Sequence, residues 1–257
     1  MRIARFEYEG RARYGLADPE SGKVREIEGA PFNGVVATGV TRRLEEVRLL
    51  APVVPGKIVA VGLNYRDHAR EMGKKIPGEP LLFLKASSAL NDPGGEIVYP
   101  PQSERVDYEA ELAVVIGRAA KNVKEKDAAA YILGYTCIND VTARDLQVKD
   151  VQYTRAKGFD TFAPLGPWIV TDIDPTEASV RCLVNGEVRQ DGNTREMRAS
   201  VFRLVEFISS VMTLFPGDVI ATGTPPGVGS LRVGDVVTVE VGGIGALTNR
   251  VVAPLRG

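Results

Sequence analysis

Residues 106–116, VDYEAELAVVI, restrict the possible folds of this chain more than any other segment. Side chains alternate between the two faces of a β-strand, so Asp107, Glu109 and Glu111 share one face, and the opposite face is apolar. Beyond Glu111 the acidic face continues as alanine and valine, so the row of acids runs into buried structure. Like charges beside an apolar interior are unfavourable unless a cation or a proton compensates them. The fold must therefore provide a compensating group or leave the acidic end in solvent.

A second β run, residues 135–140 (YTCIND), ends in Asp140, and a polar helical segment follows it. With Glu109 and Glu111 it makes three carboxylates without histidine or thiolate, an all-oxygen set that suits Mg²⁺ or Mn²⁺ better than zinc. We expect these three acids to bind one divalent ion at about 2.0–2.3 Å. There are simpler alternatives: Glu109 and Glu111 could end a solvated strand, and Asp140 could cap a helix.

The single histidine, His68, lies three residues before Glu71 in residues 64–73, which are typical of a short helix. Asn64 is a suitable N-cap for this helix, and Gly73 is a suitable stop. Positions i and i+3 share a helix face, so Glu71 could orient the imidazole as a general base. The alternative is an incidental pair on a solvent-exposed helix.

Two further segments contain groups suited to anion binding. Lys157 precedes a glycine and an aromatic cluster within residues 155–166, where a buried cation could hold an anionic substrate. Residues 222–229, TGTPPGVG, form a Gly/Pro-rich loop whose backbone donors could cradle a carboxylate. This loop is not a P-loop, and no GxGxxG opens a helix after a strand, so no nucleotide cofactor is predicted.

The overall charge argues against several classes of partner. Lys plus Arg number 32 and Asp plus Glu 33, a net charge of −1, so neither nucleic acid nor an anionic membrane is expected as the main partner. No apolar run approaches the roughly 18–20 residues that span a bilayer. Residues 1–10 lack the apolar segment of a signal peptide, and Cys137 and Cys182 fit no disulfide framework or metal motif. We therefore expect a reduced, cytoplasmic protein with free thiols.

The pattern of elements predicts an α+β fold with a large mixed sheet, because strands outnumber helices without regular βαβ alternation. A proline-punctuated stretch, residues 51–56, separates a small, mostly β N-terminal module (residues 1–52) from a larger domain (residues 53–257). Asn185-Gly186 predicts a hairpin. Strands are expected at residues 2–8, 11–17, 23–28, 57–62, 82–85, 106–117, 131–139, 166–171, 180–184 and 236–241, and helices at 64–73, 125–129, 142–148 and 199–212.

Five segments, taken in order, resemble the fumarylacetoacetate hydrolase family. They are residues 61–68 (VGLNYRDH), 107–112 (DYEAEL), 139–145 (NDVTARD), 156–161 (AKGFDT) and 222–229 (TGTPPGVG). Each motif alone is weak, but five in register are specific, and together they cover roughly residues 55–255. The resemblance implies a mixed β-roll or barrel with peripheral helices, assembled as a homodimer.

The resemblance also implies roles for individual residues. Glu109, Glu111 and Asp140 would be the ligands of Mg²⁺ or Mn²⁺, His68 and Glu71 a catalytic dyad on a lid, and Lys157 the active-site lysine. Arg144, Gln147 and Thr224 match substrate-contacting positions. Some members of the family add a fourth acidic ligand upstream of the histidine. This sequence has none there, so water would complete the shell, and Asp107 lies outside the ligand pattern.

The substrates of the family are 2-oxo acids, 1,3-diketo acids and their enols. The resemblance predicts an isomerase or decarboxylase acting on a small 2-oxo or 2-hydroxydienoic dicarboxylic acid through a metal-stabilised enolate, as in homoprotocatechuate and aromatic catabolism. The alternatives are an acylpyruvate or fumarylacetoacetate-type C–C hydrolase, an oxaloacetate decarboxylase, and a catalytically silent metal-binding module. The set of His68, Glu71 and Lys157 argues against the silent module, since a scaffold needs no base beside its metal.

The segment around His68 is also expected to move. Its helix is short, and isolated helices of that length are marginal in water. Gly62, Gly73 and the polar residues 74–80 flank it, so few apolar contacts should hold it in place. We expect residues 66–80 to be mobile without ligand and to close over a bound 2-oxo acid.

Overall fold

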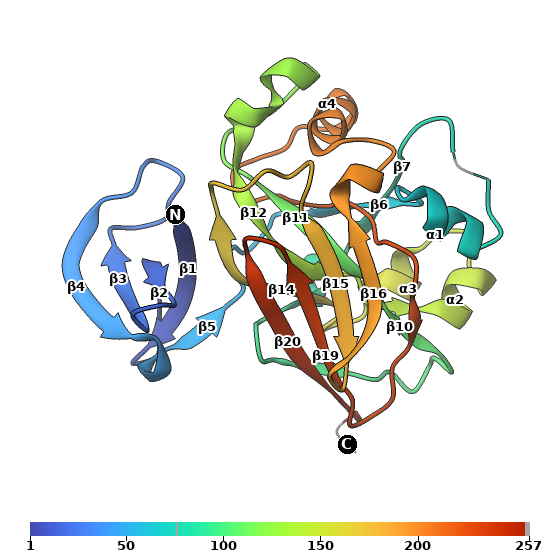
Figure 1. The fold of residues 1–257 in the computed structure, drawn as a ribbon, viewed down its shortest axis with the longest axis horizontal. Coiled ribbons are helices and arrows are strands. Elements are labelled where there is room, and N and C mark those ends of the chain that lie inside the picture. Colours follow the sequence, from blue (N-terminus) through green and yellow to red (C-terminus); the bar gives the residue numbers. More distant parts are fainter. Residues whose placement is uncertain (76, 255–257) are drawn as a thin grey trace.

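In the computed structural model, which describes residues 1–75 and 77–254, two large β-sheets pack face to face and a small β module lies to one side (Figure 1). Short helices surround the stacked sheets, so the predicted α+β class and mixed β architecture are confirmed. Ile76 and residues 255–257 lie outside the described residues; the first belongs to the predicted mobile loop and the others end the predicted larger domain.

The larger sheet has twelve strands and joins both parts of the chain. Its order is β4-β3-β2-β1-β14-β12-β11-β17-β6-β7, with β5 paired to β1 and β8 to β14. Its strands are β1 (Arg2–Tyr8), β2 (Arg11–Asp18), β3 (Lys23–Ile27), β4 (Ala37–Arg43), β5 (Arg48–Leu50), β6 (Ile58–Gly62), β7 (Leu81–Lys85), β8 (Leu90–Asn91), β11 (Ala110–Ile116), β12 (Ile132–Asn139), β14 (Ala163–Val170) and β17 (Val219–Ala221). The sheet is mixed because β17 runs parallel to β6, and β14 to β8.

The second sheet packs over the central strands of the first. Its order is β16-β15-β19-β20-β9, from β9 (Glu96–Val98), β15 (Ser179–Val184), β16 (Glu187–Asn193), β19 (Val236–Val241) and β20 (Gly245–Val252). The predicted hairpin joins β15 to β16, with Asn185 and Gly186 at φ of 54° and 83°, as a type I′ turn requires. A small third sheet, β13-β10-β18, is built from β10 (Val106–Tyr108), β13 (Thr142–Ala143) and β18 (Gly229–Ser230).

The helices are short and lie at the periphery. They are α1 (Arg66–Glu71), α2 (Arg144–Lys149), α3 (Thr154–Gly158) and α4 (Val201–Val211), with 3₁₀ turns η1 (Leu44–Glu46), η2 (Ser87–Ala89), η3 (Glu125–Tyr131) and η4 (Thr194–Glu196). The helix predicted at 142–148 begins later, because Thr142 and Ala143 pair with β10 before the chain turns into α2. Over the described residues, no helix combines the length and apolar character needed to cross a membrane.

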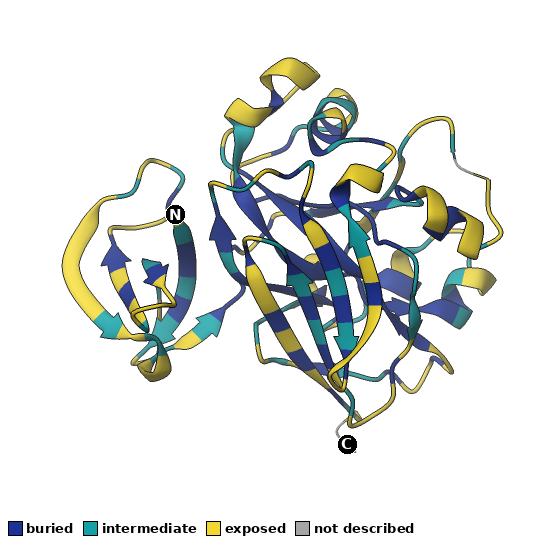
Figure 2. Cartoon of the chain, in the orientation of Figure 1, coloured by how far each residue is buried: buried dark blue, intermediate teal, exposed yellow. Residues whose placement is uncertain are grey.

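The strand predicted over residues 106–117 is interrupted at Glu109. The chain before it pairs within the small third sheet as β10, and the chain after it pairs with β12 and β17 as β11. Every residue of β11 is buried (Figure 2), because this strand lies inside the larger sheet and beneath the second one. The single strand predicted over residues 106–117 is therefore two strands, and Glu109 lies at the junction between two sheets.

The N-terminal module joins the rest of the chain through one edge. Only the start of β1 pairs with β14, in the residue pairs Arg2–Val170 and Ile3–Ile169. Strand β4 was not predicted from the sequence, and nearly all of its residues are exposed, so it lacks an alternating apolar pattern. The division of the chain at residues 52 and 53 stays a prediction.

Candidate active site

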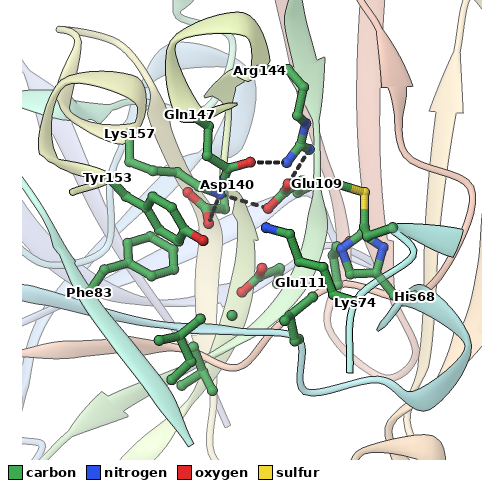
Figure 3. Close-up of a pocket in the computed structure, with 16 residues that line it drawn as sticks. His68, Lys74, Phe83, Glu109, Glu111, Asp140, Arg144, Gln147, Tyr153 and Lys157 are labelled. Carbon is green, nitrogen blue, oxygen red and sulfur yellow. Dashed lines mark hydrogen bonds and ion pairs between the residues drawn. The ribbon is translucent and has the colours of Figure 1, made fainter. Parts of the chain in front are cut away.

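A cavity lies where α1, α2 and α3 meet the ends of several strands and the Gly/Pro-rich loop (Figure 3). Eight of the nine residues predicted for the site line it, namely His68, Glu109, Glu111, Asp140, Arg144, Gln147, Lys157 and Thr224. The ninth, Glu71, lies behind His68. Segments that are far apart in the sequence therefore meet in one pocket.

The three predicted metal ligands, Glu109, Glu111 and Asp140, converge although they lie on different strands. Ala110 pairs with Asn139 across β11 and β12, and the N–H of Asp140 donates to the carbonyl of Glu109 at 2.9 Å, so the two strand ends are adjacent. One carboxylate oxygen from each of the three acids lies within 4.8 Å of the others. None of the three is more than 5 % exposed. Acids buried this closely need compensating positive charge.

Two buried lysines supply part of that charge. Lys157 Nζ lies 2.8 Å from Glu109 Oε2 and 2.6 Å from Asp140 Oδ2, so it bridges two of the acids. Lys85 Nζ lies 2.6 Å from the other oxygen of Asp140 and donates to a backbone carbonyl as well. Lys85 was not predicted from the sequence, although a lysine that ends the apolar strand LLFLK is a detectable signal of a buried cation.

The two glutamates differ in pKa because Lys157 bonds to only one of them. Burial opposes the ionisation of Glu109, but the charges of Lys157 and Arg144 outweigh it and hold its pKa well below the ordinary carboxyl range. Burial, and then the charges of Asp140 and Glu109, raise the pKa of Glu111 well above that range. Glu111 thus lacks the counter-charge that Glu109 has.

A divalent cation fits this arrangement. Glu111 is a buried carboxyl group that makes no ion pair within the part of the chain that the structure describes. The converging donors are carboxylate oxygens, which Mg²⁺ and Mn²⁺ prefer. The residues that would hold the ion are Glu109, Glu111 and Asp140. The buried triad is therefore consistent with a divalent-metal site.

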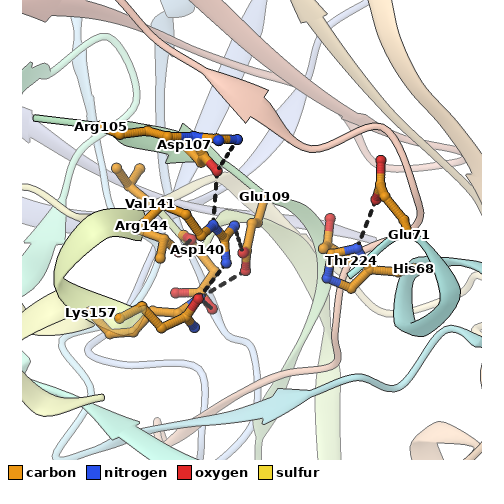
Figure 4. A network of polar contacts seen from close by, with 12 residues as sticks. His68, Glu71, Arg105, Asp107, Glu109, Asp140, Val141, Arg144, Lys157 and Thr224 are labelled. Atoms are coloured by element: carbon orange, nitrogen blue, oxygen red, sulfur yellow. Dashed lines mark hydrogen bonds and ion pairs between the residues drawn. The ribbon is translucent and has the colours of Figure 1, made fainter. Parts of the chain in front are cut away.

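Arg144, at the start of α2, ties the acids to the small third sheet (Figure 4). Its Nε donates to Asp107 at 2.8 Å, and its two terminal nitrogens bind Glu109 and, at 2.5 Å, Gln147 Oε1. Asp107 is fully buried and shared between Arg144 and Arg105, so it supports the arginine and takes no part in the triad. Substrate contact by Arg144 and Gln147 stays a prediction, since here they bond to each other.

His68 and Glu71 face each other across one turn of α1. His68 Nδ1 lies 3.1 Å from Glu71 Oε2, and the other oxygen of Glu71 accepts a hydrogen bond from Gly227 N at 3.0 Å. His68 is 5 % exposed, and its ring borders the cavity. The carboxylate therefore fixes one ring nitrogen and leaves Nε2 for a ligand. In this structure α1 is closed against the loop, and the mobility of residues 66–80 stays a prediction.

The Gly/Pro-rich loop does cradle carboxylates, but they are the protein's own. Gly223 N donates to Glu111 at 2.8 Å, and Gly227 N donates to Glu71. Gly223 has a φ of +99°, and a Cβ there would meet the Cβ of Asn64 at 2.8 Å, so only glycine fits. These two donors are thus committed to positioning the triad and the dyad.

Thr224, which was predicted to contact substrate, lines the cavity but has internal partners. Its hydroxyl donates to the carbonyl of Ala110 at 2.8 Å and accepts from Gln190 Nε2 at 2.7 Å. Gln190 Oε1 in turn accepts from Ala110 N at 2.9 Å, so the pair holds the start of β11 beside the loop. Gln190 was not predicted, because its partners Ala110 and Thr224 lie 80 and 34 residues away in the sequence. The role of Thr224 toward substrate stays a prediction.

Asn64 anchors the chain just before helix α1. Its prediction as the N-cap of α1 is wrong: Tyr65 occupies that position, and no side chain caps the helix. Asn64 is buried, and its amide donates to Thr222 O at 2.8 Å and Ala199 O at 3.1 Å while accepting from Ala199 N at 2.9 Å. The side chain prefers these distant backbone groups because they would otherwise be buried without partners.

Replacing Asn64 by alanine should lower the free energy of unfolding by about 1–3 kcal/mol, since buried backbone groups would lose their partner. Urea denaturation followed by tryptophan fluorescence would measure it. Asn33→Ala is the control, because Asn33 is exposed and has no side-chain hydrogen bond among the described residues. The control should change stability by no more than about 0.5 kcal/mol. Equal losses of stability in Asn64→Ala and Asn33→Ala would contradict the anchoring role of Asn64.

A mixed β-roll with a buried carboxylate triad, beside a lysine and a histidine, defines a class of enzyme that uses a divalent ion. Residues 57–252 match the family model described as "Fumarylacetoacetate (FAA) hydrolase C-terminal", and residues 1–52 match "Rv2993c-like, N-terminal". The chain belongs to the fumarylacetoacetate hydrolase family.

Three similar proteins bear on function. A structure titled 5-carboxymethyl-2-hydroxymuconate delta-isomerase from Mycobacterium smegmatis is 47 % identical, with a TM-score of 0.93 over 99 % of this chain and 100 % of that one. Human mitochondrial oxaloacetate tautomerase FAHD2A is 46 % identical over 80 % of this chain and 70 % of its own length. Fumarylpyruvate hydrolase from Pseudomonas aeruginosa, in complex with Mn²⁺ and pyruvate, is 33 % identical, with a TM-score of 0.74 over 78 % and 91 %.

Proposed function

We propose that this protein is a Mg²⁺- or Mn²⁺-dependent isomerase or decarboxylase of a small 2-oxo or 2-hydroxydienoic dicarboxylic acid, as in aromatic catabolism. The observation that carries the proposal is the convergence of Glu109, Glu111 and Asp140 in the cavity that also holds His68. The likeness to the Mycobacterium smegmatis isomerase over the whole chain supports the substrate class.

The three acids would hold the ion, and the neighbouring cations would complete the anion site. A divalent ion supplies Lewis-acid chemistry, because it can chelate the 2-oxo and carboxylate oxygens of a substrate and stabilise negative charge on them. Lys157, which contacts Glu109 and Asp140 and lies 5.0 Å from the centre of the Phe83 ring, would add positive charge at the same place. The substrate's 2-oxo acid end would therefore face the triad.

His68 would transfer the proton. Its Nε2 would take a proton from the carbon beside the carbonyl and return it at another carbon, which is an isomerisation. Glu71, 3.1 Å from Nδ1, would stabilise the imidazolium formed in between, and the Gly227 N–H keeps that carboxylate from rotating away. Loss of a β-carboxylate as CO₂ would depend less on this dyad, because it needs only an electron sink.

Oxaloacetate is a second candidate substrate, favoured by the 46 % identity to the human oxaloacetate tautomerase. Interconversion of its keto and enol forms needs the same proton transfer at His68. C–C hydrolysis, the reaction in the name of the Pseudomonas aeruginosa relative, would require the dyad to activate water instead. The same pocket could support each of these reactions, so a substrate panel distinguishes them.

The purified protein should turn over at least one member of a panel of oxaloacetate, acylpyruvates and hydroxydienoates when Mg²⁺ or Mn²⁺ is present. Absorbance of the enol and release of CO₂ would be recorded with the metal, with EDTA, and after metal is restored. Asp140→Asn is the control for contaminating activity, because it removes one proposed ligand. Equal rates with EDTA and with metal, or no turnover of any panel member, would contradict the proposed function.

The family resemblance also leads us to propose a homodimer in the cytoplasm. Light scattering after size-exclusion chromatography should give twice the mass of one chain. A monomer at micromolar concentration would contradict the dimer.

A further inference from the structure

One lysine of the cavity has no acidic partner. Lys74 lines the pocket, and its amino group points toward the interior (Figure 3). Among the described residues, no carboxylate lies within ion-pair distance of it. The other cations there are committed, since Arg144 binds Asp107 and Glu109, and Lys157 binds Glu109 and Asp140. Lys74 is therefore the pocket cation available to a ligand.

The backbone of Lys74 is placed by the end of the dyad helix. After α1, Gly73 adopts a φ of +63°, its N–H donates to Arg70 O, and Lys74 N donates to Ala69 O at 2.9 Å. These bonds form a Schellman motif, which ends a helix in a defined geometry and needs glycine at the left-handed position. Lys74 therefore follows α1 as a rigid extension, and its position is coupled to that of His68.

We propose that Lys74 binds the distal carboxylate of a dicarboxylic substrate whose 2-oxo acid end faces Glu109, Glu111 and Asp140. This inference rests on the proposed function, and it assigns the residue that selects dicarboxylic over monocarboxylic 2-oxo acids. A charge-assisted hydrogen bond from the ammonium group strengthens the binding of a ligand with a second carboxylate and does not strengthen the binding of a ligand whose distal end is neutral. Because Lys74 is joined to α1, the same contact holds the helix closed and places His68 over the substrate.

The test compares two ligands that differ by one charge, 2-oxoglutarate and its 5-methyl ester. Calorimetry with the Mg²⁺-loaded protein gives both dissociation constants. The wild type should bind the diacid about tenfold more tightly than the ester, the ratio expected for one charge-assisted contact. Lys74→Met should bring the ratio close to one by weakening only the diacid, and Lys74→Arg should keep most of the preference.

Lys75→Met is the matched control, because the two adjacent lysines are both exposed at the surface but only Lys74 lines the cavity. It should leave the ratio at the wild-type value. The inference is overturned if the wild type binds both ligands equally, if Lys74→Met keeps the preference, or if Lys75→Met abolishes it equally. The readout is binding, so the result is independent of the turnover panel. Suppose that the wild type turns over no substrate but prefers the diacid, and that Lys74→Met removes this preference. That outcome would contradict the proposed function and still support the role of Lys74.

Discussion

Replacing His68 by alanine should lower the rate of a proton-transfer reaction by about two orders of magnitude or more and leave Mg²⁺ affinity nearly unchanged. His68 borders the cavity and is oriented by Glu71 at 3.1 Å, but it is not one of the three converging carboxylates. The rate of a reaction that only releases CO₂ should fall less in His68→Ala. Steady-state kinetics on the substrates found with the panel, together with calorimetry of Mg²⁺, would measure both quantities.

Arg66→Ala is the matched control for this substitution, since Arg66 is on the exposed face of the same helix. It should keep the wild-type rate. The rate of Glu71→Gln should lie between the rates of His68→Ala and Arg66→Ala. This variant keeps the hydrogen bond to Gly227 but removes the charge that stabilises the imidazolium. Full activity of His68→Ala on every substrate of the wild type would exclude this histidine as the base.

Substituting Glu111 by glutamine should weaken Mg²⁺ binding by at least about a hundredfold, because losing even an outer-shell partner costs a site 10- to 100-fold in affinity. Turnover that depends on the metal should disappear with it. Calorimetry, or the metal-induced rise in melting temperature, would measure the loss. Glu104→Gln, at an exposed acid outside the triad, is the control and should bind Mg²⁺ as the wild type does. Wild-type affinity in Glu111→Gln would remove Glu111 from the ligand set.

Glu111→Gln, which should weaken Mg²⁺ binding, should raise the stability of the metal-free protein in EDTA. Burial and the charges of Asp140 and Glu109 raise the pKa of Glu111 in the folded state above its unfolded value. The folded chain then binds more protons than the unfolded chain between the two values, so this group lowers stability as pH rises through that window. Glu111→Gln should therefore melt higher than the wild type in EDTA, and by more at pH 8 than at pH 5. A lower melting temperature at both pH values would contradict this account.

Local patterns in the sequence predict most of the regular structure. The strands predicted at 2–8 and 236–241 have those bounds in the structure, and Asn185-Gly186 makes the expected turn. These features depend on alternation and on turn residues, which act between near neighbours in the chain. Strand β4 escaped prediction for the same reason, because an exposed strand carries no apolar alternation.

The residues of the site were predicted by type and by resemblance, and their partners were not. Lys85 lies 55 residues from Asp140, and Asn64 lies 135 residues from Ala199. The spacing of residues in the sequence does not predict such pairs, because they form only when separate strands and helices meet. The sequence places Lys74 in a polar loop, and only the structure places it in the pocket, where Arg144 and Lys157 are paired with acids.

The sequence by itself therefore determined the mixed α+β class, the family, and the acids and histidine that we propose carry the chemistry. Tertiary structure alone decided that the strand is interrupted at Glu109, which brings its carboxylate beside Asp140. It also decided that Lys157 pairs with Glu109, while Glu111 makes no ion pair among the described residues. The physical reason is the distance along the chain over which each kind of interaction acts. Periodicity and turn chemistry act over a few residues, whereas desolvation and ion pairing depend on which distant groups share the same buried space.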